Sequence, residues 1–209
     1  MIKLDLKKDL KHLYFPSAKK VELVQVPPLK FIMVDGGIEK GQMPGDSPAF
    51  QEAMQALYGM AYTLKFMSKL RKENPIDYPV MALEGLWWVT DGQFDFNRKD
   101  NWVYTLMILE PDHITEEMVD EARQQVVKKR SETPALSRLR LEAFEEGLCV
   151  QVMHIGPYAT EPATKERMDA FARENGYSLW GRHHEIYMGN PLRAEPEKLK
   201  TVLRQPVTK

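Results

Sequence analysis

Cysteine is scarce: the 209-residue chain has one, Cys149, which excludes an internal disulfide framework and any cysteine-based zinc site. Long apolar runs are also missing, since none approaches the roughly 20 residues that a membrane-spanning helix needs, and no signal peptide is expected. Charge of one sign is not in excess, because 29 Lys and Arg face 30 Asp and Glu. A near-neutral chain does not bind nucleic acid by broad phosphate neutralisation. These absences predict a cytoplasmic protein that binds neither membranes nor nucleic acid.

Apolar and aromatic residues, in contrast, are plentiful. Hydrophobic residues make up 43% of the chain, which contains twelve Met, eight Tyr, eight Phe and four Trp. Flexible Met side chains together with flat aromatic rings indicate a large, adaptable apolar surface. The length fits one large domain or two half-size units that share a core.

The first half of the chain predicts a basic, irregular N-terminal arm followed by strands around a long helix. Pro27 and Pro28 separate the first two strands, which is typical of a sheet edge. Ser47 has the position of an N-cap with Pro48 at the first helical position, and Thr115 caps a second helix. The expected segments are an arm over 1–20, strands over 21–26, 29–34, 79–91 and 102–109, and helices over 49–72 and 115–130.

The second half predicts a similar succession. Gly156 and Pro157 close a strand, and Asn175 with Gly176 forms the C-terminal cap of the helix that follows. Pro206 is expected to end the last strand. The expected strands cover residues 139–143, 148–155, 182–188 and 199–203, with the helix starting at residue 160.

Both halves therefore follow the order strand, glycine turn, helix, strand, strand. The third element of each carries a glutamate flanked by aromatic residues, Glu84 in the first half and Glu185 in the second. A repeated β-α-β-β unit implies a pseudo-two-fold molecule. We expect an α+β domain over 21–209, whose units (about 21–110 and 136–209) form one curved, mainly antiparallel sheet. Helices should cover its convex face, and a concave ligand trough should lie at the pseudo-two-fold axis.

Several motifs in this order resemble one family. They are Leu57-Tyr58-Gly59-Met60-Ala61-Tyr62-Thr63-Leu64-Lys65-Phe66, Leu83-Glu84-Gly85-Leu86-Trp87-Trp88, His154-x-Gly156-Pro157-Tyr158, Asn175-Gly176-Tyr177, Glu185-Ile186-Tyr187 and Pro206-Val207. From about residue 20 to its end the chain resembles the GyrI-like small-molecule-binding domain. The motifs of the first half resemble the stand-alone branch of that family, which has no DNA-binding domain.

The resemblance implies an eight-stranded pseudo-symmetric sheet and a pocket for planar, apolar, often cationic drugs, with Glu185 as its central polar group. For the stand-alone branch it implies a cofactor-free cyclopropanoid cyclopropyl hydrolase. Such an enzyme opens the cyclopropane ring of DNA-alkylating natural products of the duocarmycin and yatakemycin type, and so gives resistance to genotoxins. We expect no helix-turn-helix before residue 20, so the regulator role of other members does not carry over.

Ring opening by water needs a base, a donor to the carbonyl oxygen that gains negative charge, and a flat apolar slot. Glu185 is the candidate base, because burial among aromatic rings makes a carboxylate a better proton acceptor. Tyr62 or Tyr158 is the candidate donor. The candidates for binding the substrate are Trp88, Trp180 and Tyr187, with Glu84 and His183 as polar contacts.

Several of these residues also have a structural interpretation. Glu185 is equally compatible with a solvent-facing strand position, Glu84 with a hydrogen-bonded role at the pseudo-axis, and Tyr62 with core packing. Trp87 and Trp88 are adjacent on a strand and point to opposite faces. We expect Trp88, in phase with Glu84, in the trough and Trp87 in the core.

Metal and thiol chemistry are not expected. His183 and His184 face apart on a strand and no third ligand group accompanies them, and Cys149 has no nearby His–Asp pattern. Two functions besides the hydrolase stay open: a multidrug-binding protein that sequesters planar, apolar or cationic small molecules, and a protein-interaction module such as a topoisomerase inhibitor. The expected partners are small planar aromatic ligands, and the chain is expected to be a monomer or homodimer.

Overall fold

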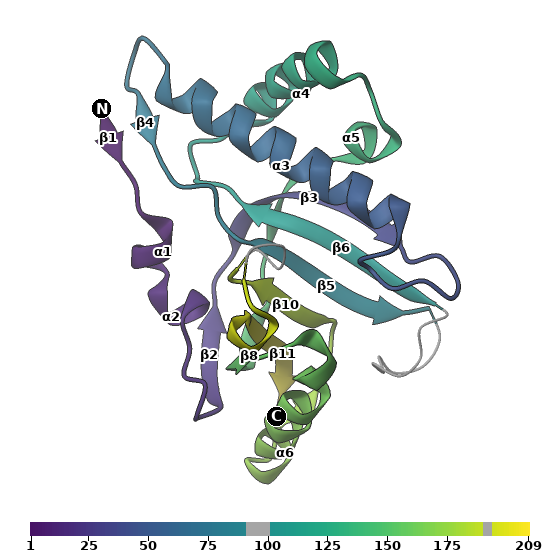
Figure 1. Ribbon diagram of the computed structural model, residues 1–209. Coiled ribbons are helices and arrows are strands. Elements are labelled where there is room, and N and C mark those ends of the chain that lie inside the picture. Colours follow the sequence, from purple (N-terminus) through teal and green to yellow (C-terminus); the bar gives the residue numbers. More distant parts are fainter. Residues whose placement is uncertain (91–100, 190–193) are drawn as a thin grey trace.

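A single large sheet dominates the computed structural model, which describes residues 1–90, 101–189 and 194–209 (Figure 1). Nine strands of these residues belong to the sheet, in the order β2-β8-β11-β10-β5-β6-β3-β7, with β9 paired to β11. Each neighbouring pair is antiparallel. The strands are β2 (Glu22–Val26), β3 (Leu29–Gly37), β5 (Leu83–Val89), β6 (Trp102–Leu109), β7 (Arg140–Phe144), β8 (Gly147–Ile155), β9 (Ser178–Leu179), β10 (His183–Tyr187) and β11 (Lys200–Thr208).

The strand order is symmetric about the central pair β5–β10. On one side β5-β6-β3 is extended by β7, and on the other β10-β11-β8 is extended by β2. Each half is a β-α-β-β unit, β3-α3-β5-β6 and β8-α6-β10-β11, where α3 spans Pro48–Lys69 and α6 spans Glu161–Glu174. The predicted α+β fold with duplicated units and a mainly antiparallel sheet is therefore confirmed.

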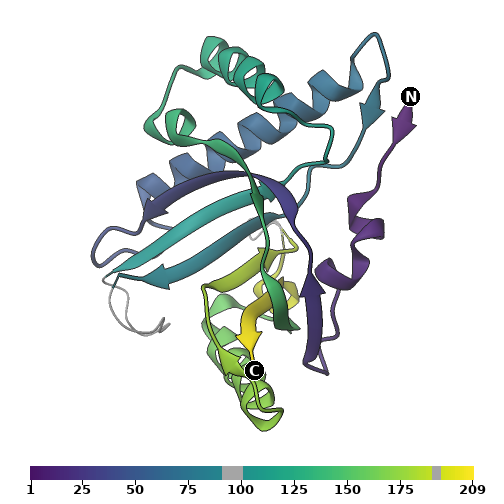
Figure 2. The ribbon, with the colours of Figure 1, turned by 180° about the vertical axis from the view of Figure 1, so that it is seen from behind.

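Helices α3 and α6 lie on the same face of the sheet (Figures 1 and 2). Phe50 of α3 stacks on Trp87 of β5 with ring centroids 5.8 Å apart, and Met168 of α6 packs with Val152 and Leu203. Helices α4 (Glu116–Arg130) and α5 (Pro134–Arg138) pack on α3. Trp87 also contacts Tyr104 of β6 at 5.7 Å. Trp87 thus belongs to the core, as its phase on the strand predicts.

The ends of α3 follow from the sequence. Ser47 accepts a hydrogen bond from the Phe50 amide at 3.1 Å and Pro48 occupies the first turn, which removes an amide that would lack a partner. Gly59 faces α4, where an added Cβ would meet only Val126 Cγ1 at 3.8 Å.

Pro206 does not end the last strand, contrary to the prediction. β11 continues to Thr208, and Pro206 pairs with Cys149 of β8. A proline near the end of a strand is tolerated where its missing amide is not needed. Its carbonyl still accepts a hydrogen bond from the Trp180 amide at 3.1 Å. The strand expected over 79–91 is shorter at its start, since β5 begins at Leu83, and residue 91 lies outside the described residues.

The N-terminal twenty residues are ordered rather than irregular. They contain β1 (Ile2–Lys3), α1 (Leu6–Asp9) and α2 (Lys11–Tyr14), and β1 pairs in parallel with β4 (Ile76–Asp77). Leu13 and Tyr14 are fully buried, so this segment is anchored in the molecule. Among the described residues, no helix combines the length and the apolar character needed to cross a membrane. Two short 3-10 turns, η1 (Tyr158–Thr160) and η2 (Pro196–Lys198), complete the described elements.

Candidate functional site

The two faces of the central β5–β10 pair carry different polar groups. Glu185 lies opposite Gly85, and His184 lies opposite Leu86. Because side chains alternate along a strand, Glu185 points toward the face covered by α3 and α6, here called the helix face. Glu84 and His184 point to the opposite, or rear, face. The prediction that Glu84 and Trp88 share a trough with Glu185 is therefore wrong, since the register places them on opposite faces. The prediction that Glu185 faces away from the helices is also wrong, because it shares its face with Trp87, which stacks on Phe50 of α3.

A short chain of hydrogen bonds holds the Glu185 carboxylate on the helix face. The Tyr187 hydroxyl donates to Glu185 Oε2 at 2.8 Å, and Trp87 Nε1 donates to the Tyr187 hydroxyl oxygen at 3.0 Å. Glu185 is 7% exposed, and His183 Nε2 lies 3.3 Å from Glu185 Oε1. The Tyr187 hydroxyl thus donates to Glu185 and accepts from Trp87. These two hydrogen bonds fix the carboxylate in place.

Gly85 makes room for this chain. A Cβ at this position would lie 2.8 Å from Trp87 Nε1 and 3.3 Å from the Tyr187 hydroxyl oxygen. Contacts this close require the two side chains to move. The absence of a side chain directly opposite Glu185 therefore permits the Trp87–Tyr187–Glu185 arrangement.

Tyr158 and Glu161 bring two more groups to the same place from η1 and the first turn of α6. The Tyr158 ring meets the Tyr187 ring edge-on with centroids 6.0 Å apart. Burial, together with the charges of Glu161 and Glu185, raises the pKa of Tyr158 to about 12. Burial and the charge of Glu185 also raise the pKa of Glu161 well above its usual range. Tyr158 therefore remains a neutral hydroxyl donor at physiological pH.

Glu161 was not singled out from the sequence. A glutamate at the start of a helix is normally an exposed residue that favours the helix dipole, so its type and position carry no signal of burial. One hint is its place shortly after the Gly156-Pro157-Tyr158 turn, which is part of a family motif and contains the candidate donor Tyr158. Its burial depends on how α6 docks on the sheet, which a single sequence does not reveal.

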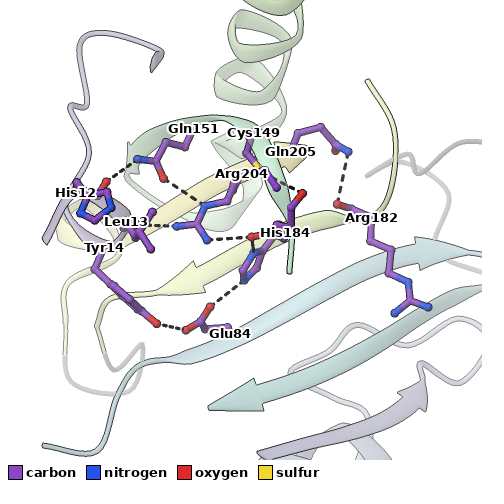
Figure 3. A network of polar contacts seen from close by, with 12 residues as sticks. His12, Leu13, Tyr14, Glu84, Cys149, Gln151, Arg182, His184, Arg204 and Gln205 are labelled. Carbon is purple, nitrogen blue, oxygen red and sulfur yellow. Dashed lines mark hydrogen bonds and ion pairs between the residues drawn. The ribbon is translucent and has the colours of Figure 1, made fainter. Parts of the chain in front are cut away.

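The rear face carries a buried polar network (Figure 3). The Tyr14 hydroxyl donates to Glu84 Oε1 at 2.5 Å. The two ring nitrogens of His184 lie 3.0 Å from Glu84 Oε2 and 2.9 Å from Glu146 Oε2. Arg204 Nη1 donates to the same Glu146 oxygen at 3.0 Å, and Arg204 Nη2 donates to the Leu13 carbonyl at 2.7 Å.

Charges in this network compensate one another. Both nitrogens of His184 face carboxylates, so the ring is held as an imidazolium that donates twice. Burial alone would lower the pKa of His184, but Glu146 and the two carboxylate contacts raise it to about 9. Burial opposes ionisation of Glu146, yet His184 and Arg204 lower its pKa to about 2. Glu84 is therefore a structural residue that ties the N-terminal segment to the sheet.

The remaining predicted site residues lie elsewhere. Trp88 is on the rear face, where the Arg182 guanidinium sits 3.8 Å from its ring centroid. Trp180 is 54% exposed and hydrogen-bonds Pro206, three positions along β11 from Leu203, the partner of Glu185. The structure therefore does not bring Trp88 or Trp180 together with Glu185.

Tyr62 lies on α3 and is 51% exposed. Its ring centroid is 6.5 Å from that of Tyr58, and both residues line a groove of about 820 Å³ between α3 and α4. Tyr62 thus belongs to this groove and not to the cluster around Glu185. Of the predicted residues, the structure therefore brings Glu185, Tyr187, His183 and Tyr158 together.

Metal binding finds no support among the described residues, which contain no group of three or more His, Cys, Asp or Glu side chains arranged to hold an ion. Cys149 is buried, and burial raises the pKa of its thiol well above the usual range. The site thus offers the hydrogen-bonded carboxylate of Glu185, the buried carboxyl of Glu161, the partly exposed Tyr158 and several aromatic rings.

Comparison with known proteins gives a family from the sequence and similar solved structures. Residues 19–208 match the model of the GyrI-like small molecule binding domain. A conserved, uncharacterized protein from Listeria innocua is 40% identical and superimposes with a TM-score of 0.88, with 98% of this chain and 100% of that one covered. A protein described as a hydrolase from the same organism is 37% identical, with a TM-score of 0.82 and the same coverage.

More distant likeness extends to one domain of another protein, EcmrR. The C-terminal domain of EcmrR is 13% identical with a TM-score of 0.55, over 91% of this chain and 98% of that domain; at this identity the likeness shows the fold alone. No curated protein matches the chain.

Proposed function

The chain belongs to the GyrI-like small-molecule-binding family, and we propose that it is a cofactor-free hydrolase in which Glu185 activates water. The proposed substrates are cyclopropanoid DNA-alkylating compounds of the duocarmycin and yatakemycin type, and the proposed role is resistance to such genotoxins. The substrate class comes from the resemblance of the sequence motifs to the stand-alone branch. Similar Listeria innocua proteins described as hydrolases, 37% and 38% identical, support an enzymatic role.

The observation that carries the proposal is the state of Glu185. Its carboxylate is buried, oriented by Tyr187, and without a Lys or Arg partner among the described residues. A buried carboxylate is costly unless it is compensated. Positioning an uncompensated carboxylate beside aromatic rings is therefore the arrangement expected of a base that acts on an apolar substrate.

The proposed reaction balances without a cofactor. A water oxygen attacks the least hindered cyclopropane carbon while one water proton passes to Glu185. The carbon–carbon bond of the ring breaks, and its electron pair moves into the dienone, whose carbonyl oxygen becomes a phenolate. A proton then reaches this oxygen to give the phenol, and Glu185 returns its proton to solvent. Ring strain and the new aromatic ring supply the driving force.

Tyr158 is the better candidate for the donor to the developing phenolate. Tyr187 already donates to Glu185, so its proton is committed. Tyr62 lies on the α3–α4 groove. The Tyr158 ring, by contrast, packs edge-on against Tyr187 beside the carboxylate. A single positioned base contributes about 10²–10⁴-fold to a rate, and one oxyanion donor about 10²–10³-fold.

Substoichiometric protein incubated with a cyclopropanoid, with the dienone absorbance followed over time, tests the proposal. We expect many turnovers per protein molecule and a hydrated phenol as product. Glu185→Gln should lower the rate by about 10²–10⁴-fold. Glu166→Gln, a change at an exposed residue of α6, is the matched control and should leave the rate unchanged. Turnover that survives in Glu185→Gln would contradict the assignment of the base.

A second candidate function is sequestration of planar, apolar or cationic molecules without chemistry. Two buried carboxyls next to the rings of Tyr158 and Tyr187 favour it, because such a cluster attracts positive charge. Binding of one ligand per chain without product, and tighter binding of cations than of neutral analogues, would support sequestration over hydrolysis.

A further inference from the structure

Glu161 has an unusual environment for a residue at the start of a helix. It is 2% exposed, and its Oε1 atom has no hydrogen-bond partner in the described part of the chain. Its carboxyl and that of Glu185 come from different elements, α6 and β10, and act on the same two tyrosines, Tyr158 and Tyr187. An unpartnered buried carboxyl oxygen is costly, so a role beyond packing is indicated.

In the described part of the chain, the groups around Glu161 include no Lys or Arg that is ion-paired with it. Glu185 and Tyr187 face it from β10, Tyr158 from η1, and Thr201 from β11. His154 of β8 contacts Thr160 and Thr164 on either side of it in the sequence.

The nearest cation on its own helix is already paired: Lys165 binds Asp169 at 2.5 Å. Tyr58 on α3 acts on Tyr158. No Lys or Arg of the described residues forms an ion pair with Glu161 or Glu185.

With no Lys or Arg of residues 1–90, 101–189 and 194–209 paired to either carboxyl, ionisation of both at neutral pH is strongly disfavoured, so one of them keeps a proton. Of the two, Glu185 accepts a hydrogen bond from Tyr187, whereas Oε1 of Glu161 has no hydrogen-bond partner among the described residues. Burial and the negative charge of Glu185 hold the pKa of Glu161 high, so Glu161 is the member that keeps the proton.

We propose that Glu161 is a positioning residue that shares one proton with Glu185 and releases it when a positively charged aromatic ligand enters the site. The inference rests on the proposed function only in using the same site, and it assigns ligand charge rather than turnover. With the proton retained, the pair holds a single negative charge. A cation beside the pair favours ionisation of Glu161, so affinity for a cation should rise with pH and affinity for a neutral analogue should not.

Isothermal titration calorimetry of ethidium, a planar aromatic monocation, tests this in phosphate and in Tris at pH 8. The heats in buffers of different ionisation enthalpy give the number of protons released. We expect up to about one proton per ethidium bound, and up to about a tenfold rise in affinity per pH unit, the limit for one linked proton. The uncharged 3,8-diamino-6-phenylphenanthridine should bind without proton release.

Glu161→Gln and Glu161→Asp separate a proton-holding role from a structural one. The amide keeps size and hydrogen-bonding capacity without the titration, so Glu161→Gln should bind ethidium with no proton release and a flat pH dependence. Glu161→Asp keeps a carboxyl and should restore the release.

Proton release that persists in Glu161→Gln would overturn the inference. So would absence of release or of ethidium binding in the unmodified protein, or a Glu161→Asp variant that binds without release. None of these outcomes bears on turnover of a cyclopropanoid, which the dienone assay measures separately.

Discussion

Both faces of the β5–β10 pair bury two carboxyl groups, but only the rear face compensates them. There, Glu84 and Glu146 meet His184 and Arg204 in a network with two negative and two positive charges. On the helix face, Glu185 and Glu161 have no Lys or Arg partner among the described residues. The comparison favours a stabilising role for the rear face, and it is consistent with the ligand-binding role that we propose for the helix face.

Removing one charge from the rear face should have the largest effect on stability. Arg204→Met leaves Glu146 buried with one partner fewer, and breaking a buried ion pair from one side costs about 3–5 kcal/mol. Urea denaturation of the variant measures the loss. Arg173→Met on the exposed Arg173–Glu166 pair is the control, for which we expect less than about 1 kcal/mol. An equally small loss for Arg204→Met would contradict the stabilising role of the network.

Alkaline pH should weaken the same face. The pKa of His184 in the folded protein, about 9, lies above its usual value of 6.5, so the stability that it contributes is complete below pH 6.5 and is lost as pH rises through 9. The shift corresponds to roughly 3 kcal/mol.

Unfolding free energies measured between pH 6 and pH 9.5 test this. The decline should be smaller in His184→Gln, which has no group to titrate at this position. Parallel pH profiles for the two proteins would show that His184 is not the group responsible.

Tyr14→Phe should have a smaller effect, because it removes one hydrogen bond and no charge. Glu84 Oε1 loses the donor that holds it at 2.5 Å, and hydrogen bonds to charged groups contribute about 1.5–3 kcal/mol. Thermal or urea unfolding gives the value. Tyr62→Phe, at a half-exposed position, serves as the matched change and should alter stability by less than about 0.5 kcal/mol.

Gly85→Ala tests the helix face, because Gly85 lies opposite Glu185. We expect it to lower turnover more than the stability of the fold. The new Cβ displaces Trp87 Nε1 and Tyr187, so the Glu185 carboxylate loses its fixed orientation. We expect about a tenfold loss of turnover, the scale of a displaced catalytic group. Gly59→Ala on α3, where a Cβ meets only ordinary contacts, should keep full activity. Equal rates for both variants would show that the Trp87–Tyr187–Glu185 geometry is unimportant.

Much of the fold could be predicted from the sequence because its signals are local. The Ser47 cap, the glycine turns and the apolar period of α3 place helices and strands correctly, and the repeated element order gives the symmetric sheet. The prediction for Pro206 is wrong because the cost of a proline in a strand depends on whether its nitrogen faces a neighbouring strand. Strand pairing decides this, and the sequence alone does not show the pairing. The order of the N-terminal segment could not be predicted locally. Its anchors, Leu13 and Tyr14, bind groups that lie far along the chain.

The site was harder to predict. The family motifs identify Glu185, and alternation along β10 adds Tyr187 and His183. Alternation alone cannot say which residues of β5 share that face, because this depends on the register between strands 100 residues apart. Gly85 opposite Glu185 reverses the expected roles of Glu84 and Trp88. Glu161 carried no signal, because its burial is a result of how α6 docks.

The most direct measurement compares one variant from each face. Turnover and the free energy of unfolding are measured for Glu185→Gln and for Glu84→Gln. We expect Glu185→Gln to lower the turnover of a cyclopropanoid by about 10²–10⁴-fold while its stability stays within about 1 kcal/mol of the unchanged protein. Glu84→Gln should do the reverse, losing stability and keeping turnover while folded. Full turnover in Glu185→Gln, with the loss appearing instead in Glu84→Gln, would contradict the division of the two faces.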